Sequence, residues 1–423
     1  MHDYRDDLTL LRDRRLSLLL GARTVSMLAS SFAPVALAFG ILDLPGATPR
    51  TLSTVLAAEA VPLVLFLLAG GVVADRYPRH RVLMAGELCS SAAFTLLAVM
   101  LLSGRAPVPA LCGAAALSGI AMAVVWPALT GIIPDVVPTD RLQSANALIG
   151  LGSNAARVTG LVASGAVVVF VGAGWALAAS AAMFAVAGTL VGLLRLDRSH
   201  LAGGTSVVKD LKDGWREFSS RSWLWVVVVQ FSVMVMALQA AHGVLGPVVA
   251  KQELGGAPAW SAVLAGEALG MIVGVLVAVR LRPRRPILVA TLFTFPVTLP
   301  YLLLGLSAPL WAVVAAAFAM GVSLDIFGVL WQTTLQREVP AEALSRVSSY
   351  DALGSLMLGP VGLLIAGPAA VSFGPHAALL GCAVIMTLTS ALALLSRGVR
   401  TMRPRPGPAE PDTTPPAPAE VIA

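Results

Sequence analysis

Charged residues are scarce in this chain. Asp, Glu, Lys and Arg make up 12% of its 423 residues, whereas a soluble globular protein carries about 25%. So few charges cannot cover the surface of a soluble protein of this length. Since 57% of the residues are hydrophobic, the composition points to lipid as the main solvent.

Cysteines are also few, and the common catalytic motifs are absent from the sequence. The three cysteines, Cys89, Cys112 and Cys382, all lie in apolar runs, which predicts neither a disulfide nor a metal site. The sequence has no G-x-x-x-x-G-K-[ST] loop, no HExxH and no CxxC. We therefore expect no enzymatic activity, no ATP-driven transport and no cofactor.

Long apolar runs are what the chain has in abundance. A helix needs about 20 apolar residues to cross the hydrocarbon core, and a window of that length finds twelve candidates. The first follows a polar start of mixed charge, which is not a cleavable signal peptide. The predicted spans are 16–42, 52–74, 82–103, 109–133, 146–171, 175–195, 223–248, 258–279, 287–307, 309–335, 347–370 and 375–396.

Basic residues set the predicted orientation. With the N-terminus inside, the cytoplasmic segments hold 24 of the 29 Lys and Arg residues, and the outer loops hold Arg50, Arg105 and Lys251. Positive charge gathers on the cytoplasmic side of membrane proteins, so both termini are predicted to be cytoplasmic. The net charge of +6 is explained in this way, and we expect no nucleic-acid partner.

The two halves of the chain repeat one another. "LAAEA" at 56–60 returns as "LAGEA" at 264–268, "DRYPRHRVLMA" at 75–85 lies over "RLRPRRPILVA" at 280–290, and "VPTDRLQSANAL" at 137–148 lies over "VPAEALSRVSSY" at 339–350. Three matches in the same order indicate a duplication, which is typical of secondary transporters. The fold class is therefore an all-α membrane protein with two pseudo-symmetric six-helix bundles, 1–195 and 223–397.

Two further segments are predicted outside the bundles. The cytoplasmic linker, 196–222, places Leu211, Trp215, Phe218 and Trp223 at near-helical spacing, which favours an amphipathic helix on the membrane surface. A plain polar linker is the alternative. The Pro-rich tail, 398–423, is predicted to be disordered.

The loop between the second and third spans carries a family resemblance. "GGVVADRYPRHR" at 70–81 resembles the signature of this loop in the major facilitator superfamily, although Pro78 and His80 depart from the usual pattern. The matching residues are Gly71, Asp75, Arg76 and Arg79. The resemblance implies a conformational latch, in which Asp75 pairs with the facing bundle and stabilises the outward-open state. Simple retention of the positive loop inside the cell is the alternative.

Three other stretches narrow the resemblance. "IPDVVP…L…ANA" at 133–147, "WREFSSRSWLW" at 215–225 and "LQREVP…L.RV" at 335–347 are similar to the branch of bacterial enterobactin and macrolide exporters. One departure stands beside them. Ala115 replaces the fourth-span arginine of many drug–proton antiporters, so the resemblance does not imply their usual coupling route.

The repeated glutamates, Glu59 and Glu267, are the main candidates for coupling. A charge at such a depth costs about 2.5–3.5 kcal/mol on insertion scales, and a carboxyl group can avoid this cost by taking up a proton. Each glutamate is therefore a candidate proton carrier. Alternatively, each binds a cationic group of the substrate, pairs with Arg23 or Arg157, or is solvated near the outer surface.

Four more residues are candidates for lining a central substrate cavity between the halves. Arg23 and Arg157 lie within the first and fifth spans, and they must face water or a carboxylate because arginine keeps its charge. Snorkelling to the interface and a fixed interhelical pair are the respective alternatives. Asp325 and His242 are candidates for titration in the tenth and seventh spans. Glu87, nearer the cytoplasm, is expected to be solvated or paired with the loop arginines.

The sequence therefore predicts a secondary active transporter of the bacterial inner membrane. We expect a monomer that exports a small amphipathic organic compound by alternating access, driven by protons. A proton-coupled uptake symporter is the alternative within transport. A transport-inactive membrane sensor or assembly partner is the alternative outside it.

Overall fold

The computed structural model describes residues 13–137, 142–194 and 215–403. Within these ranges it is built of helices, with no strand. Twelve helical segments are long and apolar enough to cross a membrane. The predicted all-α fold with twelve spans is therefore confirmed.

The N-terminal half uses one continuous helix for each span. Proline begins the second span at its first position, where no backbone N–H is needed. A glycine in the left-handed region, Gly104, ends the third. The six helices are α2 (Arg14–Leu42), α3 (Pro49–Arg76), α4 (Arg79–Ser103), α5 (Val108–Val136), α6 (Leu142–Phe170) and α7 (Ala173–Gly192).

Several spans of the C-terminal half are broken. The seventh contains a π-helical turn, η3, and prolines interrupt the ninth and eleventh because proline removes a helical N–H. The elements are α9 (Ser222–Gln239), η3 (Ala240–Leu245), α10 (Gly246–Glu253), α11 (Ala257–Ala278), α12 (Pro286–Leu292), η4 (Pro296–Thr298), α13 (Leu299–Gly305), α14 (Leu310–Glu338), α15 (Ala341–Leu356), α16 (Gly359–Phe373), α17 (Pro375–Leu395) and α18 (Arg397–Thr401).

The internal repeat reappears as a repeated helix contact. Helix α3 packs closely against α5, and α11 packs in the same way against α14. In the first pair a Cβ atom at Gly119 would overlap the carbonyl oxygen of Glu59, and in the second a Cβ at Gly321 would overlap that of Glu267. The two glutamates therefore occupy the same structural place in the two halves, as the sequence repeat indicates.

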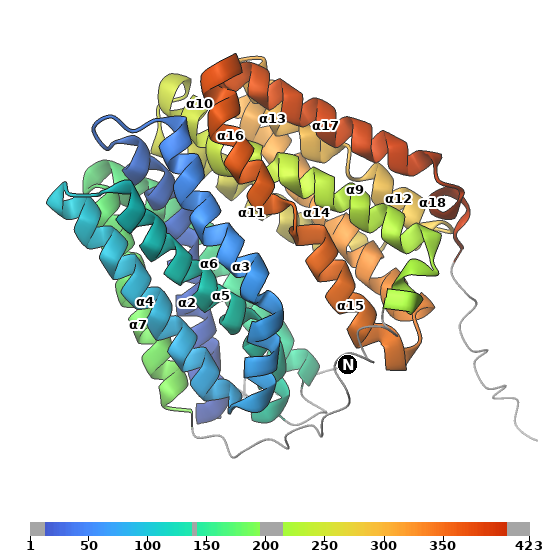
Figure 1. Cartoon of the computed structure of the whole chain (residues 1–423). Coiled ribbons are helices and arrows are strands. Elements are labelled where there is room, and N and C mark those ends of the chain that lie inside the picture. Colours follow the sequence, from blue (N-terminus) through green and yellow to red (C-terminus); the bar gives the residue numbers. More distant parts are fainter. Residues whose placement is uncertain (1–12, 138–141, 195–214, 404–423) are drawn as a thin grey trace, which may run out of the picture.

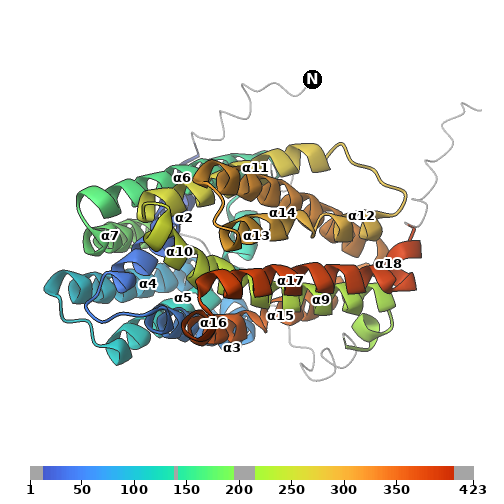
Figure 2. The ribbon, with the colours of Figure 1, turned by 90° about the horizontal axis from the view of Figure 1, so that it is seen from above.

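The two bundles lie side by side and meet at one end. Figure 2 shows α2–α7 on one side and α9–α18 on the other, with α3 beside α16 and α6 beside α11 at the seam. In Figure 1 the bundles approach one another near the start of α3 and separate towards its end. The end where they meet carries the loops predicted to be outside. The structure is thus more open at the end predicted to be cytoplasmic.

Short contacts close the end where the bundles meet. The hydroxyl of Ser53 donates a hydrogen bond to the carbonyl of Leu363. The ammonium of Lys251 lies 2.7 Å from the carboxylate of Asp43. Each contact joins one half of the molecule to the other.

The predicted segments outside the bundles are described only in part. Residues 215–219 are helical, and Phe218 is buried, stacks on Trp215 and lies tilted against Tyr350. Leu211 and the rest of the linker up to residue 214 lie outside the described residues, as does the tail from 404. The C-terminal bundle continues into α18, where Val399 is fully buried, so its packing extends beyond the predicted boundary at 397.

Candidate functional site

Two adjoining pockets lie at the seam between the halves. The larger, about 350 Å³, enters the N-terminal bundle between α2, α3, α4, α5 and α7, and we call it the N-side pocket. The smaller, about 200 Å³, lies between α2, α6, η3 and α11, and we call it the C-side pocket. Ser30, Pro34 and His242 line both. The pockets therefore adjoin, and each is lined by residues from both halves.

Glu59 lies in the wall of the N-side pocket. It follows Pro49, the first residue of α3, by ten positions, which corresponds to about 15 Å along the helix. Its carboxylate accepts a hydrogen bond of 3.0 Å from the hydroxyl of Ser118 on α5. Among the described residues it forms no ion pair with Arg23 or Arg157, so that alternative does not describe this state.

Glu267 lies in the wall of the C-side pocket, ten positions after Ala257 at the start of α11. Its carboxylate lies 3.8 Å from Nδ1 of His242. The same nitrogen lies 2.8 Å from the hydroxyl of Tyr301. His242 is part of the π-helical turn η3, a feature that is often found at functional sites. The structure thus brings together two predicted residues, Glu267 and His242.

Arg157 reaches across the seam into the C-side pocket. One guanidinium nitrogen lies 2.8 Å from the sulfur of Met271 on α11, while its buried Nε has no hydrogen-bond partner in the described structure. Asp325 on α14 is close enough for its charge to interact with those of Arg157 and Glu267. Three of the predicted cavity residues, Arg157, His242 and Glu267, therefore line the C-side pocket, and Asp325 lies near two of them.

The prediction for Glu87 was wrong. Its side chain is 3% exposed and faces the N-side pocket, rather than being solvated or held by the loop arginines. One oxygen accepts a 2.8 Å hydrogen bond from Ser26, and the other has no partner. The reason is its position eight residues into α4, about 12 Å along the helix, on the face that packs towards α2.

Arg23 interacts with Glu87 rather than with Glu59. The two charges attract one another, although no ion pair within 4 Å joins them in the described structure. Arg23 lines a separate pocket of about 320 Å³ beside the half-exposed Trp126. It therefore lines this separate pocket and not the seam pockets.

The predicted latch lies at the turn between α3 and α4. Arg76 ends α3 and is exposed, and Arg79 begins α4, so only two residues separate the helices. Gly71 and Asp75 belong to the last turns of α3, but the side chain of Asp75 lies outside the described part of the structure. The latch stays a prediction.

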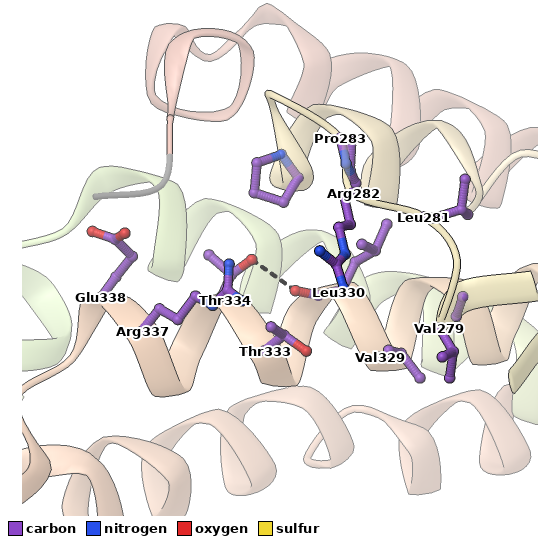
Figure 3. Close-up of a pocket in the computed structure, with 12 residues that line it drawn as sticks. Val279, Leu281, Arg282, Pro283, Val329, Leu330, Thr333, Thr334, Arg337 and Glu338 are labelled. Carbon is purple, nitrogen blue, oxygen red and sulfur yellow. Dashed lines mark hydrogen bonds between the residues drawn. The ribbon is translucent and has the colours of Figure 1, made fainter. Parts of the chain in front are cut away.

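A further cavity lies away from the seam. It has about 580 Å³ between the end of α11, the following loop and the end of α14. Figure 3 shows Arg282 reaching from the loop towards α14, where Thr334 donates a hydrogen bond to the carbonyl of Leu330. Because this pocket is lined only by the C-terminal half, it does not join the two bundles.

Nothing in the sequence singled out the aromatic residues in the wall of the N-side pocket. Phe94 and Phe184 stack with ring centres 5.3 Å apart, and both line that pocket. In an apolar span a phenylalanine is an ordinary residue, so neither position carried a signal. Glu87 did have a recognisable signal, which is its charge within an apolar run. It lies further from the cytoplasmic end of its helix than the sequence prediction assumed.

Comparisons with known proteins agree with this architecture. The family model of the Major Facilitator Superfamily matches residues 19–355. Macrolide efflux protein A of Streptococcus pyogenes is 21% identical over 355 residues, which cover 81% of this chain and 86% of that protein.

Solved structures share the fold at low identity. A nucleoside transporter, NupG, has a TM-score of 0.70 at 12% identity, covering 91% of this chain and 100% of its own. A bacterial homologue of the human lysosomal transporter Spinster, inward-facing and unoccupied, has a TM-score of 0.70 at 17% identity, covering 93% and 98%. A peptide transporter of the POT family has a TM-score of 0.74 at 11% identity, covering 93% and 99%. With the match of the family model over most of its length, the chain belongs to the Major Facilitator Superfamily and is a membrane transporter, not an enzyme.

Proposed function

We propose that this transporter exports a small amphipathic organic compound and is driven by the proton gradient. The observation that carries the proposal is the pair of adjoining seam pockets, where carboxylates from both halves lie beside apolar walls. Intramembrane carboxylates are typical of proton relays and substrate pathways. The distant similarity to a macrolide efflux protein supports export.

The transport cycle follows from the two-bundle arrangement. The seam pockets take up substrate while the molecule is open at the predicted cytoplasmic end. Rocking of the bundles then closes that end and separates the contacts at the other, including Lys251 with Asp43. Protonation of a seam carboxylate from the outside shifts the equilibrium towards the return, and the movement of protons down their gradient supplies the energy.

Transport in proteoliposomes tests this function. Antibiotics or siderophores are placed at equal concentration inside and outside the vesicles, and the outside is then made more acidic. An antiporter releases substrate as protons enter, whichever way the molecules are inserted, whereas a symporter accumulates it. Accumulation would replace export with uptake. No substrate flux under this pH gradient or under the reverse gradient would favour the transport-inactive sensor or assembly partner.

We also propose that the protein is a monomer in the bacterial inner membrane, with both termini and the 196–222 linker in the cytoplasm. The distribution of Lys and Arg over the loops supports this orientation. Single cysteines near Arg105 and Lys251 should react with an impermeant reagent added to intact cells, and one at Lys209 should not. Labelling at Lys209 would reverse the orientation.

A further inference from the structure

Glu87 has a carboxylate oxygen that nothing in the described structure satisfies. Its Oε1 accepts the hydrogen bond of Ser26, while Oε2 is buried without a partner. An unpaired polar atom in such a place is costly, and most buried polar groups have partners. Since Glu87 lines the N-side pocket, a bound molecule is well placed to supply the missing donor or positive charge.

The pocket around Glu87 is acidic. Glu59 lines the same pocket, and the described lining includes no lysine or arginine. Arg23 attracts Glu87 but lines the separate pocket beside Trp126, and it leaves Oε2 without a hydrogen bond. The two carboxylates therefore favour a positively charged guest.

The rest of the pocket is apolar and aromatic. Phe94 and Phe184 form a stacked pair, and Leu37, Leu56 and Leu63 contribute further apolar surface. Aromatic faces attract cations, with the largest effect at sites shielded from water. The volume of about 350 Å³ falls at the lower end of the range for small organic ligands.

We propose that the N-side pocket binds an amphipathic organic cation, with its positive group between Glu87 and Glu59 and its apolar body against Phe94 and Phe184. This inference rests on the proposed function, because it names the substrate class of the same seam site. It assigns recognition of charge to Glu87, which the repeated glutamates alone would not reveal.

Equilibrium binding to the purified full-length protein in detergent tests the inference. The probes are radiolabelled tetraphenylphosphonium and tetraphenylborate, which have nearly the same shape and opposite charge. Tetraphenylphosphonium should bind, and tetraphenylborate should not compete with it. Equal binding of the two ions would show that the pocket does not select for positive charge and would overturn the inference.

Substitutions test which carboxylates bind the positive charge of the probe. Glu87→Gln and Glu59→Gln should each weaken tetraphenylphosphonium binding by roughly 30-fold, because each removes a buried partner of the cation. Glu217→Gln is the matched control, since it removes the same charge from a side chain that pairs with Arg221 near the linker, and it should bind as the unchanged protein does. Unaltered binding in both pocket variants would overturn the inference.

Folding is checked by size-exclusion chromatography of every variant. If Glu87→Gln is not monodisperse, Glu87→Asp replaces it. Because Glu87→Asp keeps the charge on a shorter side chain, it should retain binding that Glu59→Gln loses. Loss of binding in Glu87→Asp together with full binding in Glu59→Gln would indicate packing rather than charge, and would overturn the inference.

The inference and the proposed function can fail separately. Charge-selective binding that depends on Glu87, without transport in proteoliposomes, would sustain the inference and refute the transport role. Proton-driven export of neutral compounds, by a protein that does not bind tetraphenylphosphonium, would sustain the proposed function and overturn the inference.

Discussion

Glu59 and Glu267 lie at matched places in the two halves but meet different chemistry. Each lies ten positions into its helix, with its carbonyl against a glycine of the partner helix. The carboxylate of Glu59 has a serine as its neighbour, whereas that of Glu267 has a histidine at 3.8 Å and lies near Asp325. Duplication has thus kept the backbone packing, while the side chains around the carboxylates have diverged. We therefore expect stability to be most sensitive to substitutions in the helix contact that the two halves share.

The largest effect is expected where the backbones meet. Gly119→Val and Gly321→Val should each prevent stable folding or cost at least about 3 kcal/mol, because the new side chain overlaps a carbonyl oxygen of the packed helix. Thermal unfolding in detergent, followed by size-exclusion chromatography, measures the loss. Gly113→Val and Gly328→Val are matched controls on the same two helices, since a Cβ at either position meets open space. Equal losses in tests and controls would contradict the proposed role of close packing.

The next largest effect separates the two carboxylates. Glu59→Gln should abolish the response of transport to a pH gradient while allowing passive exchange, because a permanently neutral side chain cannot exchange a proton. Glu267→Gln should keep the response if duplication preserved only geometry, and should change substrate preference or stability instead. Counterflow and gradient-driven flux in proteoliposomes distinguish the two results. If both variants retain full pH-driven transport, neither carboxylate couples transport to protons.

A smaller effect, on turnover, is expected from substitutions near the loops that follow α3 and α11. The repeat places Asp75 of the first half over Arg280 of the second, so only the first loop has the acidic residue of the predicted latch. Asp75→Asn should lower turnover about tenfold with little change in substrate binding, since a shift of ~1.4 kcal/mol moves the equilibrium between states by that factor. Arg280→Gln is the matched control. Normal turnover and normal accessibility of the inner end in Asp75→Asn would remove the latch.

The smallest effect concerns two tryptophans, each in the fourth span of its half. Trp331 is buried and donates a 3.0 Å hydrogen bond to Asp351, while Trp126 is 55% exposed beside Arg23. Trp331→Phe should lower stability by about 1–3 kcal/mol, because it leaves a buried acceptor without this donor. Trp126→Phe should change it by less than about 0.5 kcal/mol. Similar melting temperatures for the two variants would mean that the hydrogen bond contributes little.

The fold was accessible from sequence because it depends on the sum of many residues. Twenty apolar residues in a row predict a span whichever way the helix is turned, and three ordered repeats predict two halves. The site depends instead on the rotation of each helix about its axis. Within an apolar helix the lipid-facing and inward-facing residues look alike, so the sequence could not show that Glu87 faces the pocket or that Phe94 and Phe184 line it. Breaks such as η3 also shift the register of a span, and His242 lies within that turn.

The glycines at the closed end have a practical consequence. A Cβ at Gly367 of α16 would lie within 3 Å of the backbone of α3, and one at Gly165 of α6 would collide with Ser261 of α11. Both contacts join the halves at the closed end, and in the proposed cycle they separate when that end opens. A larger side chain there should destabilise the conformer that is closed at this end, and leave the conformer that is open there unaffected. Alanine at either position is therefore a tool for trapping the opposite conformer for structure determination, without a ligand or an antibody fragment.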